Sequence, residues 1–401
     1  MRHGLPTRGY RDGGGSLSMQ QEAILLGSDA VAHGVRLCRP EVISAYPITP
    51  QTHIIETLSE MVDRGDLHSE FIKVESEMSA IAAVLGSVSA GSRSFTASSS
   101  QGLAMMHEIL HWYAGARLPL VLVNANRALG APWNIWSDQS DSFSQRDTGW
   151  LQIYCETSQE ALDSIVIAYK AGEQLMLPVM VMIDGFILSH TMERLRLPEE
   201  EEVDRYLPAY QPPYRLDWEK PLTFGAAAHP DLFYELKQTQ AATMQEAFAV
   251  LRQCETDFAR QFGRLYTPVM GCPEGDDASD CVIICCGAMT GTARVAVARL
   301  KENGEAAALY KIRLVRPFPQ AELKLKLAGK KEIIVLNRAC SYGVGGTLSQ
   351  EIRAALYDLE KRPLIKDVMI SLGGKEVFPE TIMNIVRNRA QLSSSECNWL
   401  A

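Results

Sequence analysis

Three side chains in the N-terminal half of the chain lie at positions where proteins with a parallel sheet usually bind their ligands. They are the hydroxyl of Thr49, the carboxylate of Glu77 and the guanidinium of Arg127. Each follows an apolar run of strand length, and ligands of open parallel sheets bind outside the carboxyl ends of the strands. The prolines on either side of Thr49 would hold its hydroxyl and amide in one place. An arginine directly after a strand suits a bidentate grip on a carboxylate.

Each of these residues also has a purely structural interpretation. Thr49 could lie in an ordinary proline turn. Glu77 could complement the dipole of the helix that begins there. Arg127 could form an ion pair with Asp184 or Asp138, which would explain it nearly as well as a substrate carboxylate would.

Two further segments lie near these residues in the sequence. Residues 98–102 open a helix with serine hydroxyls, for which N-capping is a sufficient explanation. Residues 133–150 contain several tryptophans and are too long and aromatic for a passive connection. We expect them to form a lid or a subunit contact.

A competing motif occurs at His107-Glu108-Ile109-Leu110-His111, which matches H-E-x-x-H. On a helix this spacing puts two imidazoles on one face with a glutamate base, as zinc peptidases require. A third ligand is needed, yet residues 112–155 contain neither histidine nor glutamate. The apolar positions around the motif favour a helix that crosses between parallel strands, so a zinc peptidase is a remote alternative.

The elements that must position these side chains alternate between strand and helix. Helical patterns at 23–37, 77–89 and 102–116 separate apolar runs at 42–46, 71–74, 94–97, 118–124 and 179–183. Such runs predict an α/β fold with a doubly wound parallel sheet covered on both faces. After an acidic run, a proline-rich stretch and a long polar helix at 232–262, further strands at 281–286, 306–309, 332–336 and 368–371 predict a second, smaller α/β domain.

Composition limits the classes of protein that the chain can belong to. The 401 residues are 46% hydrophobic and 22% charged, which is typical of a globular protein. No apolar run reaches the roughly 18–20 residues that cross a bilayer, so we expect a soluble protein without a membrane contact. A net charge of −9 without a basic cluster argues against nucleic acid as a partner. The nine cysteines include no C-x-x-C pair. This pattern predicts that the protein is located in a reducing cytoplasm and that this chain holds no zinc or iron–sulfur site.

The expected organisation follows from these patterns. In order along the chain we expect a disordered leader (1–18), the larger domain (19–200), a linker with the long helix (201–270), the smaller domain (271–392) and a tail (393–401).

Several motifs taken in order closely resemble the alpha subunit of 2-oxoacid:ferredoxin oxidoreductases, most of all the pyruvate:ferredoxin type (pyruvate synthase). They are Y-P-I-T-P at 46–50, E-S-E-M-S-A at 75–80, S-S-Q-G-L at 99–103, N-R-A-L at 126–129, Q-R-D-T-G-W at 145–150 and D-G-F-I-L-S-H at 184–190. N-R-A-C-S-Y-G-V-G-G at 337–346 and L-G-G-K-E-V at 372–377 look like that family's transketolase-C-like second domain. The family would have Arg-Asp at Lys375-Glu376, a departure that keeps the charges.

The resemblance implies a thiamine-diphosphate-binding domain of the pyrimidine type and a role for each candidate residue. Glu77 matches the glutamate that hydrogen-bonds the pyrimidine ring nitrogen, and Thr49 and Arg127 match the residues that hold the substrate carboxylate. The residues implied in cofactor binding beside Glu77 are Tyr46, Pro47 and Ile48. The implied reaction is the reversible oxidative decarboxylation of pyruvate to acetyl-CoA and carbon dioxide, with coenzyme A as co-substrate and ferredoxin as electron acceptor.

What the chain lacks is equally informative. Thiamine enzymes bind the diphosphate through a divalent metal at a G-D-G motif, which does not occur here, and the cysteine spacing of ferredoxins is also missing. The resemblance therefore implies beta, gamma and delta partner subunits, or equivalents, that carry Mg²⁺ and [4Fe-4S] clusters, in a dimer of heteromers. Branched-chain or other 2-oxoacids remain alternative substrates, and a structural subunit with a dead site is a further alternative.

Overall fold

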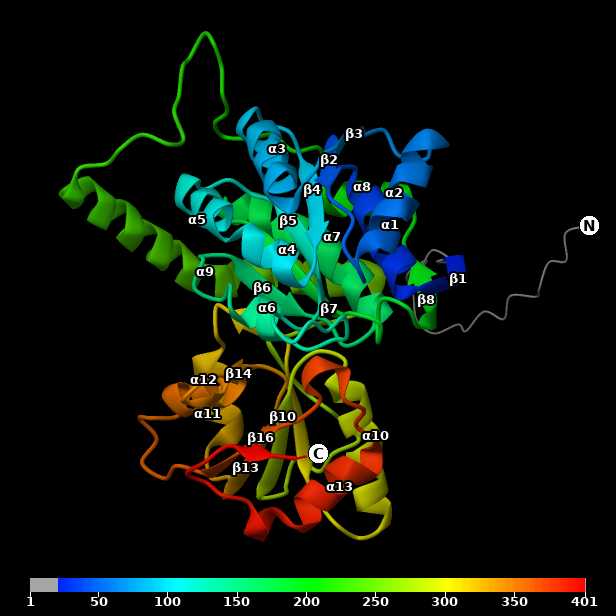
Figure 1. The fold of residues 1–401 in the computed structure, drawn as a ribbon, viewed down its shortest axis with the longest axis vertical. Helices are drawn as coiled ribbons and strands as arrows, with labels where there is room; N and C mark the ends of the chain where they lie inside the picture. Colours follow the sequence, from blue (N-terminus) through cyan, green and yellow to red (C-terminus); the bar gives the residue numbers. More distant parts are fainter. Residues whose placement is uncertain (1–20, 401) are drawn as a thin grey trace, which may run out of the picture.

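The computed structural model describes residues 21–400, and the leader predicted at 1–18 lies outside them. Within this range the larger domain, the upper one in Figure 1, is built on a seven-stranded sheet in the order β12-β6-β7-β5-β4-β2-β3. All neighbouring strands are parallel except β12 and β6. The predicted doubly wound parallel sheet is confirmed. Its strands are β2 (Val42–Ala45), β3 (Glu70–Lys73), β4 (Ser94–Ser98), β5 (Val121–Asn126), β6 (Leu151–Tyr154), β7 (Val179–Asp184) and β12 (Leu314–Arg316).

Helices cover both faces of this sheet because its central strands are buried on both sides. One hydrophobic cluster joins the sheet to α1 (Gly27–Cys38), α2 (Thr52–Asp63), α7 (Ser158–Leu175), α8 (Glu200–Tyr206) and α9 (Pro230–Phe262). The other face is covered by α3 (Glu77–Ser89), α4 (Ser100–Met105) and α5 (His107–Ala116). None of the helices formed by residues 21–400 is both long and apolar enough to cross a membrane.

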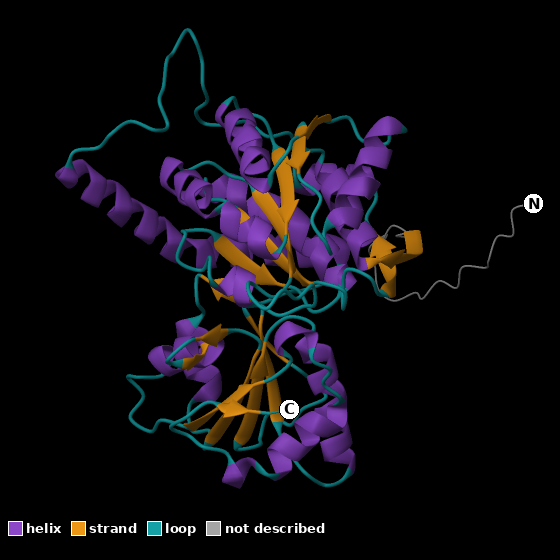
Figure 2. Ribbon diagram, in the orientation of Figure 1, coloured by secondary structure: helices purple, strands orange, loops and turns teal. Residues whose placement is uncertain are grey.

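The smaller domain repeats this layered plan, as Figure 2 shows. In the described residues its sheet has the order β17-β16-β13-β10-β11-β9, and only β9 is antiparallel to its neighbour. Its strands are β9 (Val269–Gly271), β10 (Cys281–Cys285), β11 (Ala308–Ile312), β13 (Glu332–Asn337), β16 (Leu364–Met369) and β17 (Asn398–Trp399). One face packs on α10 (Met289–Glu302) and α13 (Pro379–Arg387), and the other on α11 (Gln320–Leu327) and α12 (Thr347–Ala355).

Short elements complete the described chain. They are the strand pair β1 (Gln21–Leu26) and β8 (Met192–Leu197), the hairpin β14 (Cys340–Ser341) and β15 (Gly345–Gly346), the helix α6 (Ser140–Phe143), and the 3₁₀ turns η1 (Leu372–Gly374) and η2 (Arg389–Gln391).

The two domains share a sheet and a hydrophobic core. β12 follows β11 directly in the sequence, yet it pairs with β6 in the sheet of the larger domain. Buried charges accompany this exchange: the ammonium of Lys311 lies 2.7 Å from Glu160 Oε2, and the guanidinium of Arg313 lies 2.5 Å from Glu255 Oε1. Because isolated buried charges are costly, these pairs require both domains to fold against each other.

Two of the predicted helices are wrong in extent. Residues 23–26 belong to β1, which pairs antiparallel with β8, so α1 begins only at Gly27. The single helix predicted at 102–116 is two helices, because the backbone turns at Met106 (ψ −9°), whose side chain is fully buried. Hydrophobic periodicity is similar on the two sides of this turn and does not reveal it.

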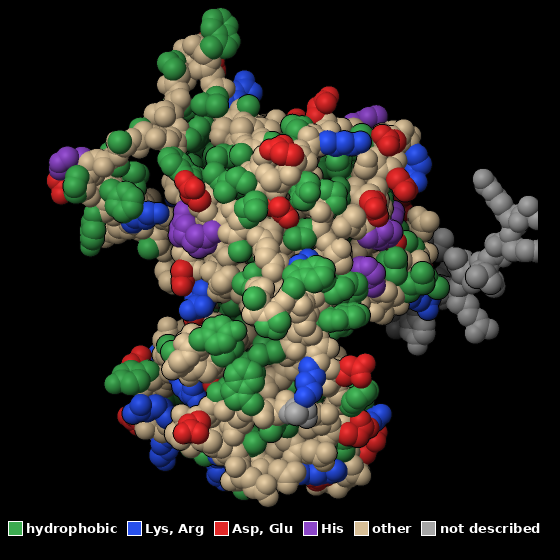
Figure 3. Space-filling model, in the orientation of Figure 1, with side chains coloured by type: hydrophobic (Ala, Val, Ile, Leu, Met, Phe, Trp, Pro, Cys, Tyr) green, Lys and Arg blue, Asp and Glu red, His purple; other side chains and the backbone are tan. Residues whose placement is uncertain are grey.

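A projecting arm (residues 207–240) leaves the larger domain between α8 and the middle of α9 (Figures 1 and 2). Its base is fixed by hydrogen bonds from Leu216 N to Ser89 O (2.7 Å) and from Tyr214 Oη to Arg117 O (2.7 Å). Seven of its large apolar side chains are nevertheless 48–89% exposed, and Figure 3 shows patches of hydrophobic side chains along the arm. They are Leu216, Trp218, Leu222, Leu232, Phe233, Tyr234 and Leu236.

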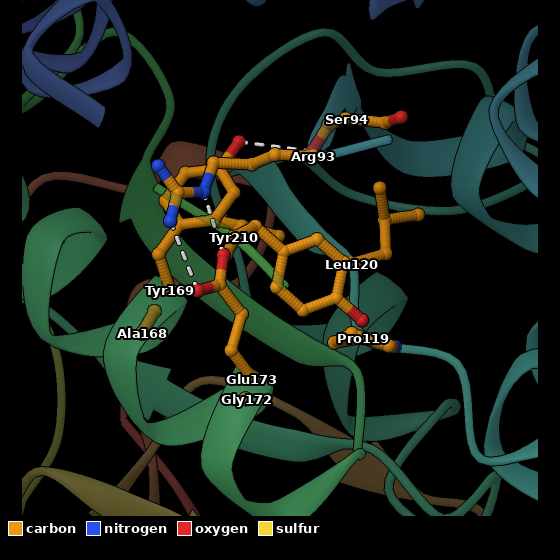
Figure 4. A pocket seen from close by; sticks show the side chains of 10 residues that line it. Arg93, Ser94, Pro119, Leu120, Ala168, Tyr169, Gly172, Glu173 and Tyr210 are labelled. Carbon is orange, nitrogen blue, oxygen red and sulfur yellow. Dashed lines mark hydrogen bonds and ion pairs between the residues drawn. The ribbon is translucent and has the colours of Figure 1, made fainter. Parts of the chain in front are cut away.

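The small pocket in Figure 4 is a structural feature of the larger domain. Arg93 pairs there with Glu173 through both carboxylate oxygens (2.6 and 2.9 Å), and it also donates to the carbonyl oxygens of Cys38 and Pro208 (2.8 Å each). Arg93 thereby ties β4 to α7 and to the start of the arm.

Candidate active site

Four neighbouring strands of the larger sheet bring the predicted site residues to one edge. In the order β5-β4-β2-β3, these strands are followed at their carboxyl ends by Arg127, Gln101, Thr49 and Glu77 respectively. The chain connects β2 to β3 on one side and returns past β2 to β4, so the strand order reverses between β2 and β4. Such a reversal opens the crevice in which doubly wound sheets bind ligands.

Arg127 is held at this edge without a carboxylate partner. Its Nη1 donates to the carbonyl oxygen of Thr49 (2.7 Å) and its Nη2 to Gln101 Oε1 (3.0 Å). The side chain is buried and its Nε atom has no hydrogen-bond partner in the described structure. Burial lowers the pKa of Arg127, although the carboxylates of Asp141 and Glu77 oppose this shift. A guanidinium without an acidic partner at a ligand edge is suited to binding an anion.

The ion pairs considered as alternatives for Arg127 do not form. The carboxylate of Asp184 pairs with Arg338 of the smaller domain and accepts from Ala288 N (2.6 Å). The carboxylate of Asp138 accepts from the amide of Gly373 (3.2 Å). Within residues 21–400 the guanidinium of Arg127 therefore has no acidic side chain at ion-pair distance.

Glu77 begins α3 and turns its carboxyl group into the site. Ser76 caps the helix by accepting from Ser79 N (3.2 Å), and Glu77 itself is only 7% exposed. Among the described residues its carboxylate accepts no hydrogen bond. It lies against Gly102 of α4, where an added Cβ atom would come within 2.6 Å of Glu77 Oε1. A carboxylate on a largely buried side chain that accepts no hydrogen bond in the described structure is free to bind a ligand.

The neighbouring acid, Glu75, points elsewhere. Its side chain is exposed to solvent and receives a hydrogen bond from the hydroxyl of Ser79, which lowers the pKa of Glu75. The two carboxylates of the E-S-E motif are thus distinguished by burial, and the structure turns only Glu77 towards Arg127 and Gly102.

The segment after β2 is rigid but reaches the surface. The amide of Ile48 donates to Gln51 Oε1 (3.2 Å), and Gln51 Nε2 donates to the carbonyl oxygen of Ala97 on β4 (3.0 Å). Thr49 is exposed, and it touches Arg127 through its carbonyl oxygen rather than its hydroxyl. Tyr46 and Pro47 are also exposed, while Ile48 is half-buried.

Asp141 is a site residue that the sequence analysis missed. Its fully buried carboxylate accepts from the amides of Ser100 (2.9 Å) and Arg127 (3.1 Å) and from the side chains of Asn124 (2.9 Å) and Asn126 (2.8 Å). It thereby joins the loops that carry Gln101 and Arg127. Burial raises the pKa of Asp141 to about 6. A lone aspartate in a polar loop gives no sequence signal beyond its position shortly after the Arg127 strand.

One expectation for these segments needs correction. Ser99 and Ser100 do not cap α4: their hydroxyls donate to the carbonyl oxygens of Ala125 (2.7 Å) and Ala128 (2.5 Å) instead. The long loop after β5 contacts the smaller domain of its own chain, because Asn134 Nδ2 donates to Gly373 O (3.0 Å). The loop therefore forms an interdomain contact, and its expected role as a lid or a subunit contact stays a prediction.

The H-E-x-x-H motif does not assemble a metal site in residues 21–400. His107 and His111 lie close together on α5, with ring centroids 4.9 Å apart, but His107 Nδ1 is hydrogen-bonded to Gln145 Oε1 (2.5 Å). No group of three or more potential metal-ligating side chains occurs in the described part of the chain.

These residues fit one half of a thiamine diphosphate site. The carboxyl group of Glu77, which lies against Gly102, is free to hydrogen-bond a pyrimidine nitrogen, and the guanidinium of Arg127, which has no acidic partner in residues 21–400, is free to bind a carboxylate. Nothing comparable in residues 21–400 offers a set of oxygen ligands for the metal that a diphosphate requires.

Comparisons with known proteins identify the family to which both domains belong. The family model "Pyruvate flavodoxin/ferredoxin oxidoreductase, thiamine diP-bdg" matches residues 33–256, and the model "Pyruvate:ferredoxin oxidoreductase core domain II" matches residues 279–382. The two matches correspond to the two domains of the structure.

Individual relatives cover almost the whole chain. Ketoisovalerate oxidoreductase subunit VorA of Pyrococcus horikoshii is 42% identical over 93% of this chain and 94% of its own length. Pyruvate synthase subunit PorA of Methanothermobacter thermautotrophicus is 40% identical over 94% of this chain and 97% of its own. A solved 2-oxoglutarate:ferredoxin oxidoreductase from Magnetococcus marinus shares the fold over 92% of this chain (TM-score 0.70, 24% identity), which spans 65% of that longer chain.

Proposed function

Since the chain belongs to the pyruvate flavodoxin/ferredoxin oxidoreductase family, we propose that it is the alpha subunit of a multisubunit enzyme that oxidises pyruvate. The reaction consumes pyruvate and coenzyme A, releases acetyl-CoA and carbon dioxide, and passes two electrons to ferredoxin. The observation that carries the proposal is that Arg127, whose guanidinium has no acidic partner in residues 21–400, and Glu77, whose carboxylate accepts no hydrogen bond there, meet at one sheet edge.

Each residue has a defined task in this proposal. Arg127 and Thr49 hold the carboxylate of the 2-oxoacid while it is charged, and Gln101 orients the guanidinium through its bond to Nη2. Glu77 holds a proton in a hydrogen bond to the pyrimidine nitrogen, beside Tyr46, Pro47 and Ile48. Thiamine diphosphate, when bound, supplies the nucleophilic carbon that adds to the 2-oxo group.

The remaining parts of the enzyme belong to other chains in this proposal. The sequence has no G-D-G motif and no ferredoxin-type cysteine spacing, so Mg²⁺ and the [4Fe-4S] clusters are assigned to beta, gamma and delta partners in a dimer of heteromers. The exposed apolar side chains of the arm support such an assembly, because apolar patches of this kind usually mark protein contacts. All nine cysteines are free thiols, which supports a cytoplasmic location.

A branched-chain 2-oxoacid is a second candidate substrate. It is favoured by the 42% identity to ketoisovalerate oxidoreductase subunits, which is as high as the identity to pyruvate synthase subunits.

The proposal is tested on the complex and on the chain alone. The complex copurified from native cells should reduce viologen dyes with pyruvate only when coenzyme A is present. Calorimetry should find weak binding of thiamine diphosphate to the isolated chain, with or without Mg²⁺. The proposed function is wrong if none of the 2-oxoacids tested supports reduction of the dye by the complex. The assignment of half a site is wrong if the isolated chain binds thiamine diphosphate tightly in the presence of Mg²⁺.

A further inference from the structure

An exposed indole overhangs the buried guanidinium of the site. Trp133 lies in the loop that follows β5, and 76% of its surface is exposed. The Cζ atom of Arg127 lies 5.9 Å from the centroid of its ring. The indole is therefore a large apolar side chain that lies over the guanidinium of Arg127 and remains open to solvent.

The loop presents this indole from a fixed frame. The amide of Ala128 donates to the carbonyl oxygen of Trp136 (3.0 Å), which closes the loop at its base. Asn134 accepts from Trp136 N (2.6 Å) and donates to Gly373 O in the smaller domain (3.0 Å). With its base held in two places, the loop keeps Trp133 over Arg127 without packing the indole into the core.

The second tryptophan of the loop provides a contrast. Trp136 packs against the ring of Phe186, with centroids 4.8 Å apart, and its Cβ atom lies against Gly374. These contacts account for the position of Trp136, although 52% of its surface is exposed. Trp133 has no aromatic neighbour among the described residues, and its one close charged group is the cation that is free to bind an anion.

We propose that Trp133 is a specificity-determining residue whose indole contacts the side chain of the 2-oxoacid held at Arg127 and limits its size. This inference rests on the proposed function. An indole adds no hydrogen bond to an aliphatic side chain, so it selects by volume: it covers the methyl group of pyruvate and collides with a branched chain. A hydrophobic contact of this kind discriminates about 10–200-fold per methylene group.

The experiment compares two substrates in the assembled enzyme. Trp133→Ala and Trp133→Phe are prepared in the complex, and kcat/KM is measured with pyruvate and with 2-oxoisovalerate. The ratio of 2-oxoisovalerate to pyruvate should rise about 10-fold or more for Trp133→Ala and less for Trp133→Phe. Trp136→Phe, a matched change of the packed indole, should leave the ratio within about twofold.

The outcomes separate this inference from the function on which it rests. An unchanged ratio in an intact Trp133→Ala complex overturns the inference, while pyruvate oxidation by the same complex leaves the proposed function standing. If both Trp133 variants fail to assemble, the residue is a subunit contact and the inference is wrong. A wild-type complex that is inactive on every 2-oxoacid instead overturns the proposed function.

Discussion

Replacing Arg127 by lysine distinguishes a substrate-binding arginine from a structural one. The substitution keeps a positive charge but removes the fork of N–H donors. In the structure that fork contacts only neutral acceptors, the carbonyl oxygen of Thr49 and the amide oxygen of Gln101. No buried carboxylate in residues 21–400 loses an ion-pair partner in this variant. The substitution should therefore weaken substrate binding and leave the stability of the fold nearly unchanged.

The magnitude follows from the bonds that the variant cannot make. A hydrogen bond to a charged group contributes about 1.5–3 kcal/mol, which corresponds to a loss of about 10–150-fold in kcat/KM. The assay is viologen reduction by the assembled complex at saturating and sub-saturating pyruvate. Calorimetry on the same samples should show a Tm change of no more than about 2 °C, as expected for less than 1 kcal/mol in a chain of this size.

Arg93 is a matched control, because it is as deeply buried as Arg127 but is paired with Glu173 through both carboxylate oxygens. Arg93→Lys should lower Tm and leave KM unchanged in the complex that survives, since it disrupts a buried pair far from the substrate. The reasoning is refuted if Arg127→Lys behaves like Arg93→Lys, with a lowered Tm and kcat/KM within twofold of the wild type.

Three further changes test the frame around this arginine. Glu77→Gln in the assembled complex should lower turnover by about 10²–10⁴-fold with assembly intact, whereas Glu75→Gln should not; the reverse result would identify Glu75 as the functional acid. Gly102→Ala should lower kcat because its Cβ atom would come within 2.6 Å of Glu77 Oε1. Gly86→Ala is the control, because a Cβ atom at Gly86 would meet no atom within 4 Å. Equal kcat values for the two variants would contradict this prediction. Burial raises the pKa of Asp141 from 3.8 to about 6. The folded chain therefore binds a proton at Asp141 more tightly than the unfolded chain does. As a result, the contribution of Asp141 to the free energy of unfolding rises as pH falls from 6 towards 4. The difference in Tm between wild type and Asp141→Asn should therefore move in favour of the wild type between pH 7.5 and 4.5, and a shift the other way would contradict the assignment.

The sequence predicted the central strands of both sheets because they are apolar on both faces. The runs at 94–97 and 179–183 lie within β4 and β7, and that at 281–286 matches β10 to within a residue. The prediction fails where the signal is not local. Residues 23–26 have an apolar spacing that also suits a helix, and only their pairing with β8, far along the chain, makes them a strand.

The pairing of β12 with β6 in the sheet of the larger domain could not be predicted from any local sequence pattern. The strand Leu314–Arg316 is too short to stand out, and its partner β6 lies about 160 residues earlier in the chain. The buried partners of Lys311 and Arg313 were invisible for the same reason, because Glu160 and Glu255 come from other parts of the sequence.

The candidate site likewise contains residues that a local sequence pattern reveals and residues that it does not. Thr49, Glu77 and Arg127 could be predicted because the end of a parallel strand is recognisable in the sequence, and the structure brings all three to one edge. Their roles remain predictions. Asp141 and the overhang of Trp133 depend on how the segment after β5 folds back onto the ends of β4 and β5, which no local sequence pattern reveals.

The smaller domain explains why only part of this edge is open. Asp184, at the end of β7, is enclosed by Arg338 and Ala288 of the smaller domain, and Gly373 fixes the loop after β5. The carboxyl end of β7 is therefore covered by the chain's own second domain. The ends of β2 and β3 have no such cover, and Thr49 remains exposed there. If a partner chain completes the site, as proposed, we expect it to approach over β2 and β3, where Thr49 is exposed and the carboxylate of Glu77 accepts no hydrogen bond among the described residues.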